Sequence, residues 1–382
     1  MTGPTRICGR CVMDASVPGI VFDADGHCNY CRDLLVRSRG VLFAGEAERE
    51  RALTHLVERV KARGRGRPYD CIVGVSGGLD SAWALHKAVE LGLRPLAVHM
   101  DNGWNSELAQ HNIEQLIKRL GVDLFTHVID WPEYRKLMQA FFDADVVDVE
   151  LLYDNALAGV NFRQAARHRL KHVLTGVNQA TEGMKMPAGW NWCKRDRRNI
   201  LAIWRRFGDG GRLRTFPAVG TAHELYYSCA RGIEWLSFLD YFEYDKARSL
   251  ALLAERYDYK PYPYKHYESV FTRFYQGYIL PKKFGVDKRR VHFSSLVMSG
   301  QLSRADALAS LQHSPYPSEE ALEQDIAYFI KKMGWTRQRL EEYLARPAKP
   351  HAMYGSEKPA YELLMPISQR LMSYSKTRSR AA

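Results

Sequence analysis

Two groups of residues in the sequence have the types and spacing that chemistry requires. The first is a set of four cysteines, paired as Cys8-x-x-Cys11 and Cys28-x-x-Cys31 with sixteen residues between the pairs. The second is the stretch VGVSGGLDS (residues 73–81), in which an apolar run breaks at Ser-Gly-Gly and helix-forming residues follow. The first pattern is typical of a metal site, and the second is typical of a phosphate site.

The cysteine spacing predicts a tetrahedral zinc site, because each Cys-x-x-Cys turn presents two thiolates to one ion. Between the pairs, the sequence VFDADGHCNYC contains Asp25 and Gly26, which predict the tight turn of a zinc ribbon. Two disulfides are disfavoured, since the start of the chain has no apolar leader and a cytoplasmic protein is expected. A redox or iron–sulfur site stays open as an alternative.

In the glycine stretch, Ser76, Gly77 and Gly78 are expected to form the turn between a strand and a helix. Two glycines let the backbone N–H groups point inward, and the helix adds the positive end of its dipole, so the turn predicts an anion nest. No Lys-Ser/Thr follows the glycines, which distinguishes the stretch from a Walker loop. We expect Asp80 to hold magnesium on the phosphates, with Ser81 adding a hydroxyl donor.

The elements that must position these groups follow from the pattern after residue 70, where short apolar runs alternate with amphipathic segments. This alternation predicts an α/β fold, with a doubly wound parallel sheet covered by helices on both faces. The expected strands are 71–75, 95–99, 124–129, 172–174 and 235–239, and the expected helices are 79–91, 106–120, 133–142 and 151–170. Ligands of such sheets bind beyond the carboxyl ends of the strands, where the Ser-Gly-Gly turn lies.

The rest of the chain is expected to flank this sheet. We predict a zinc ribbon over residues 1–40, a connecting helix and linker over 41–66, a nucleotide-binding domain over 67–260 and a helical region over 261–382. In the last region, Ser303 and Ser318 precede helical runs as N-caps do.

The composition of the chain limits the chemical classes of partner that we expect. The 382 residues carry 55 Lys and Arg against 43 Asp and Glu, a net charge of +12 that indicates an anionic partner. The basic residues are scattered rather than interleaved with aromatic residues, so nucleic acid is not favoured over nucleotides. No run approaches the roughly 18 apolar residues of a membrane span, and no membrane partner is expected.

The motif SGGxDS directly after a strand resembles the pyrophosphate loop of ATP pyrophosphatases, of the adenine nucleotide α-hydrolase type. Those enzymes cleave ATP between the α and β phosphates and transfer AMP to a substrate oxygen. The resemblance implies that the loop residues grip the departing pyrophosphate; they are Ser76, Gly77, Gly78, Asp80 and Ser81.

Two later segments extend this resemblance. In HMDNGW, Asp101 and Asn102 are implied to bind the adenosine. In LTGVNQATEG, Gly176 is implied to allow close backbone approach to the nucleotide, and Glu182 to reach the reacting end.

Together with RICGRCVMDASVPGIVFDADGHCNYC and the segment from YKHYESVF to SGQLSR, these motifs resemble the N-acetyl sugar amidotransferase family over residues 6 to about 310. The family acts in the biosynthesis of surface polysaccharides such as lipopolysaccharide O-antigen. The resemblance implies that the acetamido oxygen of an N-acetyl sugar is adenylated, and that ammonia then displaces AMP to leave an acetamidino group. ATP, Mg²⁺ and Zn²⁺ are the implied cofactors.

Further expectations concern ammonia and the acid–base groups. The chain shows no glutaminase signature, so a separate glutaminase subunit is implied to supply ammonia. Lys265 and Glu268 join Asp80 and Glu182 as catalytic candidates, although their segment also fits a solvated amphipathic helix.

A tRNA-modifying enzyme of the thiolation type is the alternative function, and a non-catalytic nucleotide-binding scaffold is another. For thiolation, Cys193 has basic neighbours that are expected to lower its pKa, and Cys229 is a second candidate. Cys71 opens a buried strand and is expected to pack in the core.

Overall fold

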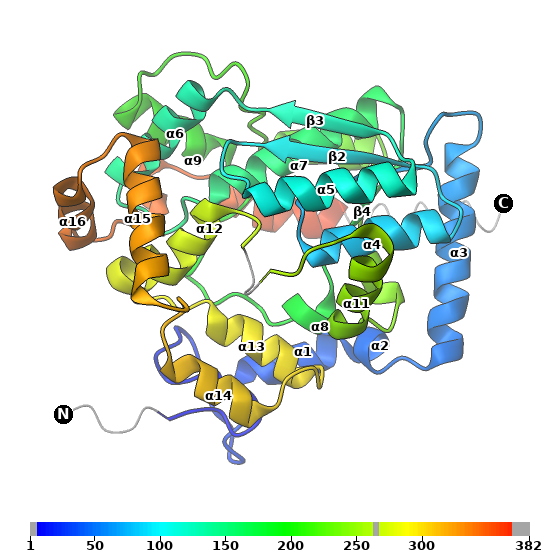
Figure 1. The fold of residues 1–382 in the computed structure, drawn as a ribbon, viewed down its shortest axis with the longest axis horizontal. Helices are drawn as coiled ribbons and strands as arrows, with labels where there is room; N and C mark the ends of the chain where they lie inside the picture. The colour runs from blue at the N-terminus through cyan, green and yellow to red at the C-terminus, as the bar shows by residue number, and fades with distance from the viewer. Residues whose placement is uncertain (1–5, 263–266, 369–382) are drawn as a thin grey trace.

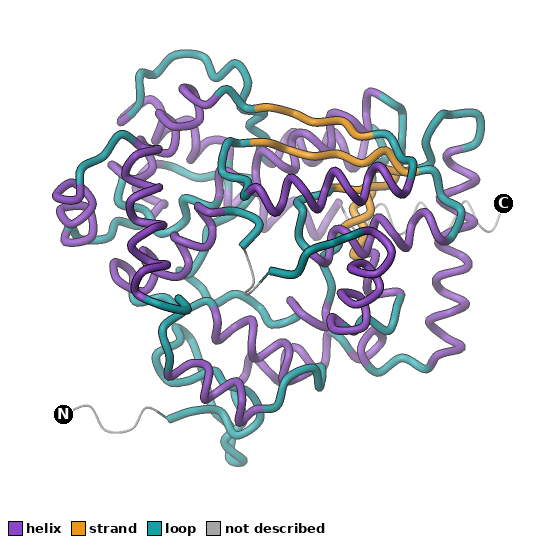
Figure 2. Tube along the Cα trace, viewed as in Figure 1, coloured by secondary structure: helices purple, strands orange, loops and turns teal. Residues whose placement is uncertain are grey.

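The computed structural model describes residues 6–262 and 267–368. At its centre lies a sheet of five parallel strands: β1 (Cys71–Gly74), β2 (Pro95–Asp101), β3 (Leu124–Val128), β4 (His172–Thr175) and β5 (Glu234–Ser237). Their order is β3-β2-β1-β4-β5, so the predicted doubly wound parallel sheet is confirmed (Figure 2).

The strand order reverses between β1 and β4. The chain adds β2 and β3 on one side of β1, then returns to place β4 on the other side, with Ile72 beside Val173. In open α/β sheets the crevice outside such a reversal is the usual place for a ligand. The Ser-Gly-Gly turn follows β1 and Gly176 follows β4, so both lie at this crevice.

Helices cover both faces of the sheet (Figure 1). On one face, α4 (Leu79–Glu90), α5 (Glu107–Leu120) and α11 (Lys246–Tyr257) contact one another. On the other, α7 (Leu151–Arg167) packs on β1, β2 and β4, and α6 (Trp131–Asp143) packs on α9 (Arg197–Phe207). The core divides accordingly, because Ile72 joins one buried cluster while Cys71 and Val73 join the other.

The predicted strands and helices of the sheet domain are all present, with shifts of a few residues at their ends. Among the strands, β2 continues beyond its expected end to Asp101, because Asp101 pairs with Val128 of β3, and β5 ends earlier than expected, at Ser237. The predicted caps are confirmed as well: Ser303 accepts a hydrogen bond from Asp306 N, and Ser318 from Ala321 N.

Further helices flank the sheet domain. Before it lie α1 (Asn29–Arg37), α2 (Arg39–Leu42) and α3 (Glu46–Gly64). Short elements within it are α8 (Gln179–Glu182), α10 (Thr221–Leu225), a π-helix (Tyr226–Ala230) and a 3₁₀ turn (Phe238–Tyr241). After it come α12 (Val270–Phe274), a π-helix (Tyr275–Phe284), α13 (Arg289–Met298), α14 (Arg304–Gln312), α15 (Glu319–Met333), α16 (Arg337–Ala345), a 3₁₀ turn (His351–Tyr354) and a helix over 358–368.

The N-terminal segment packs against α13 and α14, about 280 residues away along the chain (Figure 1). Val12 N donates to Ser294 Oγ at 3.3 Å, and Arg290 forms an ion pair of 2.8 Å with Asp14. Arg304 donates to the carbonyl oxygens of Cys8 and Cys11. Within the described ranges, no helix is long and apolar enough to cross a membrane.

Candidate active site

The turn after β1 is curled into a nest by its own hydroxyl groups. Ser76 Oγ lies 3.1 Å from Ser81 Oγ and accepts a hydrogen bond of 3.3 Å from Gly78 N. Ser81 Oγ accepts from Ser76 N at 3.2 Å and donates to Gly78 O at 2.9 Å. The two serines therefore hold the N-terminal end of α4 open toward the crevice, in the manner of an anion site.

Gly77 is required at the tip of this turn for two reasons. Its φ of +86° is a backbone conformation that residues with a side chain rarely adopt. A Cβ there would also lie 2.9 Å from the Cβ of Ala109 in α5. The hydroxyls of Tyr259 and Tyr262 both donate to Gly77 O at 2.9 Å, which fixes the orientation of that carbonyl.

Asp80 lies in the first turn of α4, where two hydroxyl groups orient its carboxylate. Tyr244 Oη donates to Asp80 Oδ1, and Thr181 Oγ1 donates to Oδ2 at 3.5 Å. Burial and the charge of Asp80 both raise the pKa of Tyr244, so Tyr244 stays a proton donor. A carboxylate held this way offers the oxygen ligands that magnesium prefers, so Asp80 fits the predicted metal role.

The crevice opens into a cavity of about 720 Å³. Ser76, Glu182 and Glu268 line it together, although they come from three separate segments of the chain. Glu268 lies beside the nest, since a Cβ on Gly78 would be 3.7 Å from its carboxyl carbon. Its backbone is anchored to the loop after β2, where Ser106 N donates to Glu268 O at 2.9 Å. Lys265 lies outside the described residues.

The two candidates after β2 differ in their surroundings. Asp101 is half-buried and accepts a hydrogen bond of 2.8 Å from Gly103 N. Asn102 is buried, donates to Tyr134 Oη at 3.3 Å and accepts from Trp104 N at 3.2 Å. Asn102 thus shapes the loop after β2, while Asp101 remains the more accessible of the pair.

The cavity wall also carries ion pairs between residues that are far apart in the sequence. Lys288 bonds to Glu150 Oε2 at 2.6 Å, and Gln276 donates to both oxygens of that carboxylate. Lys194 lies 2.9 Å from Asp154. All five side chains line the cavity.

Lys194 also reaches the buried Asp148, at 2.7 Å. Burial alone would lower the pKa of Lys194, but the carboxylates of Asp148 and Asp154 outweigh burial and raise that pKa. Lys194 therefore stays charged, and the half-buried carboxylate of Asp154 faces the cavity beside it. Carboxylate and amide groups placed around a cavity can bind the hydroxyl groups of a polar acceptor.

One expectation about an individual residue is wrong. The basic Arg273, in the segment after Glu268, forms a two-point ion pair with Asp325, so its charge is already paired. For Cys193 the predicted direction is wrong, because burial raises the pKa of its thiol. Cys71 is fully buried in the core, as predicted.

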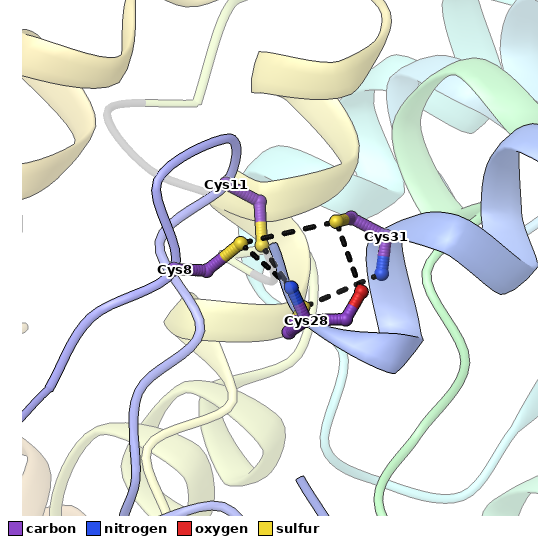
Figure 3. A group of neighbouring side chains, drawn as sticks. All are labelled: Cys8, Cys11, Cys28 and Cys31. Carbon is purple, nitrogen blue, oxygen red and sulfur yellow. Dashed lines mark hydrogen bonds between the residues drawn. The ribbon is translucent and has the colours of Figure 1, made fainter. Parts of the chain in front are cut away.

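The four N-terminal cysteines converge on one point (Figure 3). Cys8 Sγ lies 3.8 Å from Cys31 Sγ, and Cys11 Sγ lies 3.6 Å from Cys28 Sγ. A zinc ion with bonds of about 2.3 Å to four sulfurs would place those sulfurs about 3.8 Å apart, whereas a disulfide needs about 2.05 Å. The cluster therefore fits a four-thiolate metal ion and excludes disulfides in this arrangement.

These features define the class of the protein. A parallel sheet reversing at β1, with a Ser-Gly-Gly turn and an orienting carboxylate after that strand, makes a nucleotide-binding α/β domain of the pyrophosphate-loop type. A cysteine cluster precedes this domain and a helical region follows it.

Comparison with known proteins adds a family for the last part of the chain. Residues 268–368 match the family described as "LPS biosynthesis protein WbpG-like, C-terminal domain". The expected relationship to a lipopolysaccharide-biosynthesis family is thereby confirmed over this segment, which begins at the cavity residue Glu268.

Other similarities are more distant. A GMP synthase [glutamine-hydrolyzing] of Pyrobaculum aerophilum is 41% identical over 78 residues, which are 20% of this chain and only 15% of that protein. Among solved structures, an NH3-dependent NAD synthetase from Campylobacter jejuni has a TM-score of 0.29 and 17% identity, covering 56% of this chain and 83% of its own. The U34-tRNA thiolase NcsA from Methanococcus maripaludis has a TM-score of 0.29 and 14% identity, and the match covers 81% of this chain and 89% of the thiolase chain.

Proposed function

We propose that this protein is an ATP-dependent, AMP-forming amidotransferase that acts on an N-acetyl sugar in lipopolysaccharide biosynthesis. One observation carries the proposal: the pyrophosphate loop opens into the same cavity as Glu268, the first residue of the WbpG-like segment. An ATP-binding element and the part of the chain related to lipopolysaccharide biosynthesis therefore meet at one site.

In the proposed reaction, the pyrophosphate of ATP lies in the nest formed by Ser76, Gly78 and Ser81. Asp80 would hold Mg²⁺, which neutralises phosphate charge when bound. The acetamido oxygen attacks the α-phosphorus, the bond to the pyrophosphate oxygen breaks, and the acetamido carbon becomes an electrophile.

Ammonia then adds to that carbon, and AMP leaves with the former acetamido oxygen. One proton must be lost from the nitrogen for the acetamidino group to form. Glu182 and Glu268 line the cavity on the loop side, so we assign proton transfer to these carboxylates. The ion-paired wall at Glu150 and Asp154 would hold the sugar hydroxyls.

We propose further that ammonia comes from a separate glutaminase subunit, in the cytoplasm where ATP is available. A cysteine nucleophile for glutamine hydrolysis would need an accessible thiolate. Burial disfavours this form in Cys71 and Cys193, because it raises the pKa of both thiols.

The alternative, a tRNA-thiolating enzyme, would need a reactive sulfur at the cavity. Among the described residues lining the cavity, none is a cysteine, which favours amidation over thiolation. The deciding assay measures AMP and pyrophosphate release with ammonium chloride, using N-acetylated nucleotide sugars in one arm and bulk tRNA in the other. Release with an N-acetyl sugar supports the proposal, whereas release only with tRNA would overturn it.

A further inference from the structure

A second cavity, of about 400 Å³, lies on the α7 and α9 side of the sheet, and four of its twelve lining residues are arginines. Arg163 comes from α7, Arg197 and Arg205 come from α9, and Arg212 comes from the loop after α9. His223 of α10 completes the basic lining. None of these residues lines the 720 Å³ cavity, so this site is separate from the one that holds the pyrophosphate loop.

The four guanidinium groups of this cavity outnumber the one carboxylate, that of Glu357, whose charge reaches His223. Within the described part of the chain, none of the four arginines forms an ion pair, and no acidic residue is part of the lining. Burial, followed by the charges of Arg197 and Arg163, lowers the pKa of His223, and the charge of Glu357 opposes this shift without reversing it. Uncompensated guanidinium groups around a concavity are suited to bidentate binding of phosphate.

The nearby carboxylates have hydrogen-bond or ion-pair partners other than the four arginines. Asp209 pairs with Lys136 at 3.0 Å, and Glu224 pairs with Arg195 at 2.8 Å. Glu357 accepts backbone N–H groups at the starts of α9 and α10. Among the described residues, none of these carboxylates forms an ion pair with the four arginines, which distinguishes the cavity from an ion-paired surface.

The walls of the cavity are held in place before any ligand arrives. Trp204 Nε1 donates to Gly211 O at 2.7 Å, which fixes the loop that carries Arg212. Asn155 bonds to both the N–H and the carbonyl of Val219, which fixes the segment that includes Ala218. A rigid concavity of this size suits a small molecule. Its aromatic lining residues, Trp204 and Phe216, are buried and leave no stacking platform for single-stranded nucleic acid.

We infer that this arginine cavity binds a small molecule that carries two or more phosphate groups, such as inorganic pyrophosphate or a nucleoside diphosphate. The ligand binds apart from the reacting ATP, at a site that does not depend on the function proposed above.

Calorimetric titration of the full chain with inorganic pyrophosphate, without Mg²⁺, tests this inference. The wild type is expected to show two sites, because the pyrophosphate loop binds the same probe. The double variant Arg197→Glu/Arg205→Glu should weaken one site at least tenfold, and Arg212→Glu should weaken the same site. The matched control Arg198→Glu/Arg206→Glu places the same charge change on α9 outside the cavity and should keep both sites.

Gly78→Val separates this inference from the proposed function. This variant adds a side chain to the nest at a φ of −72°, which any residue adopts. It should remove pyrophosphate binding at the pyrophosphate loop and keep binding at the arginine cavity. If Gly78→Val changes nothing, the loop assignment fails while the arginine cavity stands. Equal binding in the Arg197→Glu/Arg205→Glu variant and its control would overturn the arginine cavity. A parallel titration with an RNA oligonucleotide gives a further outcome. If Arg197→Glu/Arg205→Glu loses binding of this RNA while its pyrophosphate binding stays intact, the inference is also overturned.

A parallel titration with a nucleoside diphosphate distinguishes the two sources of the phosphate groups. Binding at least tenfold tighter than that of pyrophosphate at the arginine site would assign the cavity to a nucleotide. Equal or weaker binding would assign it to pyrophosphate itself.

Discussion

A Cβ atom added to Gly176 would lie 2.5 Å from the carbonyl carbon of Asp80. The chain leaving β4 therefore passes directly over the first turn of α4, with no room for a side chain between them. This contact fixes the distance between the two sides of the crevice at which the sheet order reverses.

Gly176→Ala is expected to weaken ATP binding by about tenfold or more, because the added methyl group must push α4 and the nest apart. The overpacking should also cost about 1–3 kcal/mol of unfolding free energy. Equilibrium ATP binding and urea unfolding measure the two effects. Gly40→Ala is the matched control, since a Cβ at Gly40 meets no atom within 4 Å. Unchanged ATP binding in Gly176→Ala would show that the nucleotide does not use this crevice.

Asp80→Asn should lower the rate of AMP formation by about 100-fold, since it removes the charge that orients phosphate and metal while keeping the shape of the side chain. The melting temperature should stay within a few degrees of the wild type. Glu58→Gln removes an exposed carboxylate from α3 and serves as the control. A full rate in Asp80→Asn would remove Asp80 from the reaction.

Asp154→Asn should raise the KM for the acceptor by about tenfold, because one charged hydrogen bond is worth about 1.5 kcal/mol. Lys194 keeps its bond to Asp148 in this variant, so the fold and the KM for ATP should not change. Asp209→Asn is the matched control, because Asp209 is similarly exposed and is paired with Lys136 away from the cavity. If Asp154→Asn raises the KM for ATP as much as the KM for the acceptor, Asp154 does not act by binding the acceptor.

Removing the metal from the cysteine cluster should destabilise the protein. The cluster ties the N-terminal segment to α13 and α14, so a chelator or Cys28→Ser should lower the melting temperature by ten degrees or more. Cys229→Ser, at an exposed cysteine, should have no effect. Metal analysis of the purified protein should find one zinc ion per chain. A loss of activity without any loss of stability would contradict a purely structural role.

Stability should fall as the pH is lowered from about 6.5 to 4, partly because of His351. Burial lowers the pKa of His351 to about 4, so the folded state keeps it neutral while the unfolded chain binds a proton below 6.5. The contribution of His351 is on the order of 3 kcal/mol and should be lost across this window. Its Nε2 accepts from Asp148 N at 3.2 Å, a bond that protonation would break.

Urea unfolding at several pH values checks this expectation. His351→Gln should flatten the dependence between pH 6.5 and 4, whereas His313→Gln, at an exposed histidine, should leave it unchanged. An equally steep dependence in His351→Gln would assign the effect to other groups.

The sheet and the nest could be predicted from sequence because their signals are local. Alternating apolar runs set the strands, and the glycines with Asp80 and the flanking serines lie within nine residues of one another. The cysteine cluster was predictable for the same reason, since the spacing within each pair already limits the geometry.

The acceptor side of the cavity was not predictable, because it is assembled from distant segments. Glu150 precedes α7, Gln276 lies in a π-helix and Lys288 precedes α13, and each fits an ordinary solvated position when its own segment is read alone. The available signals were the carboxylates in DVELLYDN, at the start of a buried helix, and the basic run KFGVDKRR, which contains Lys288 and fits a substrate site as well as a surface. The direction for Cys193 was wrong because burial by tertiary contacts outweighs the charge of neighbours in sequence.

In the proposed reaction, the acetamido oxygen of an N-acetyl sugar receives AMP. An acceptor labelled with ¹⁸O in its acetamido group, incubated with ATP and ammonium chloride, tests this step by mass analysis of the products. Transfer of AMP to the acetamido oxygen predicts one ¹⁸O atom in the phosphate of AMP, none in pyrophosphate, and an acetamidino sugar without label. Unlabelled AMP, with the label retained in the sugar or released to water, would contradict it.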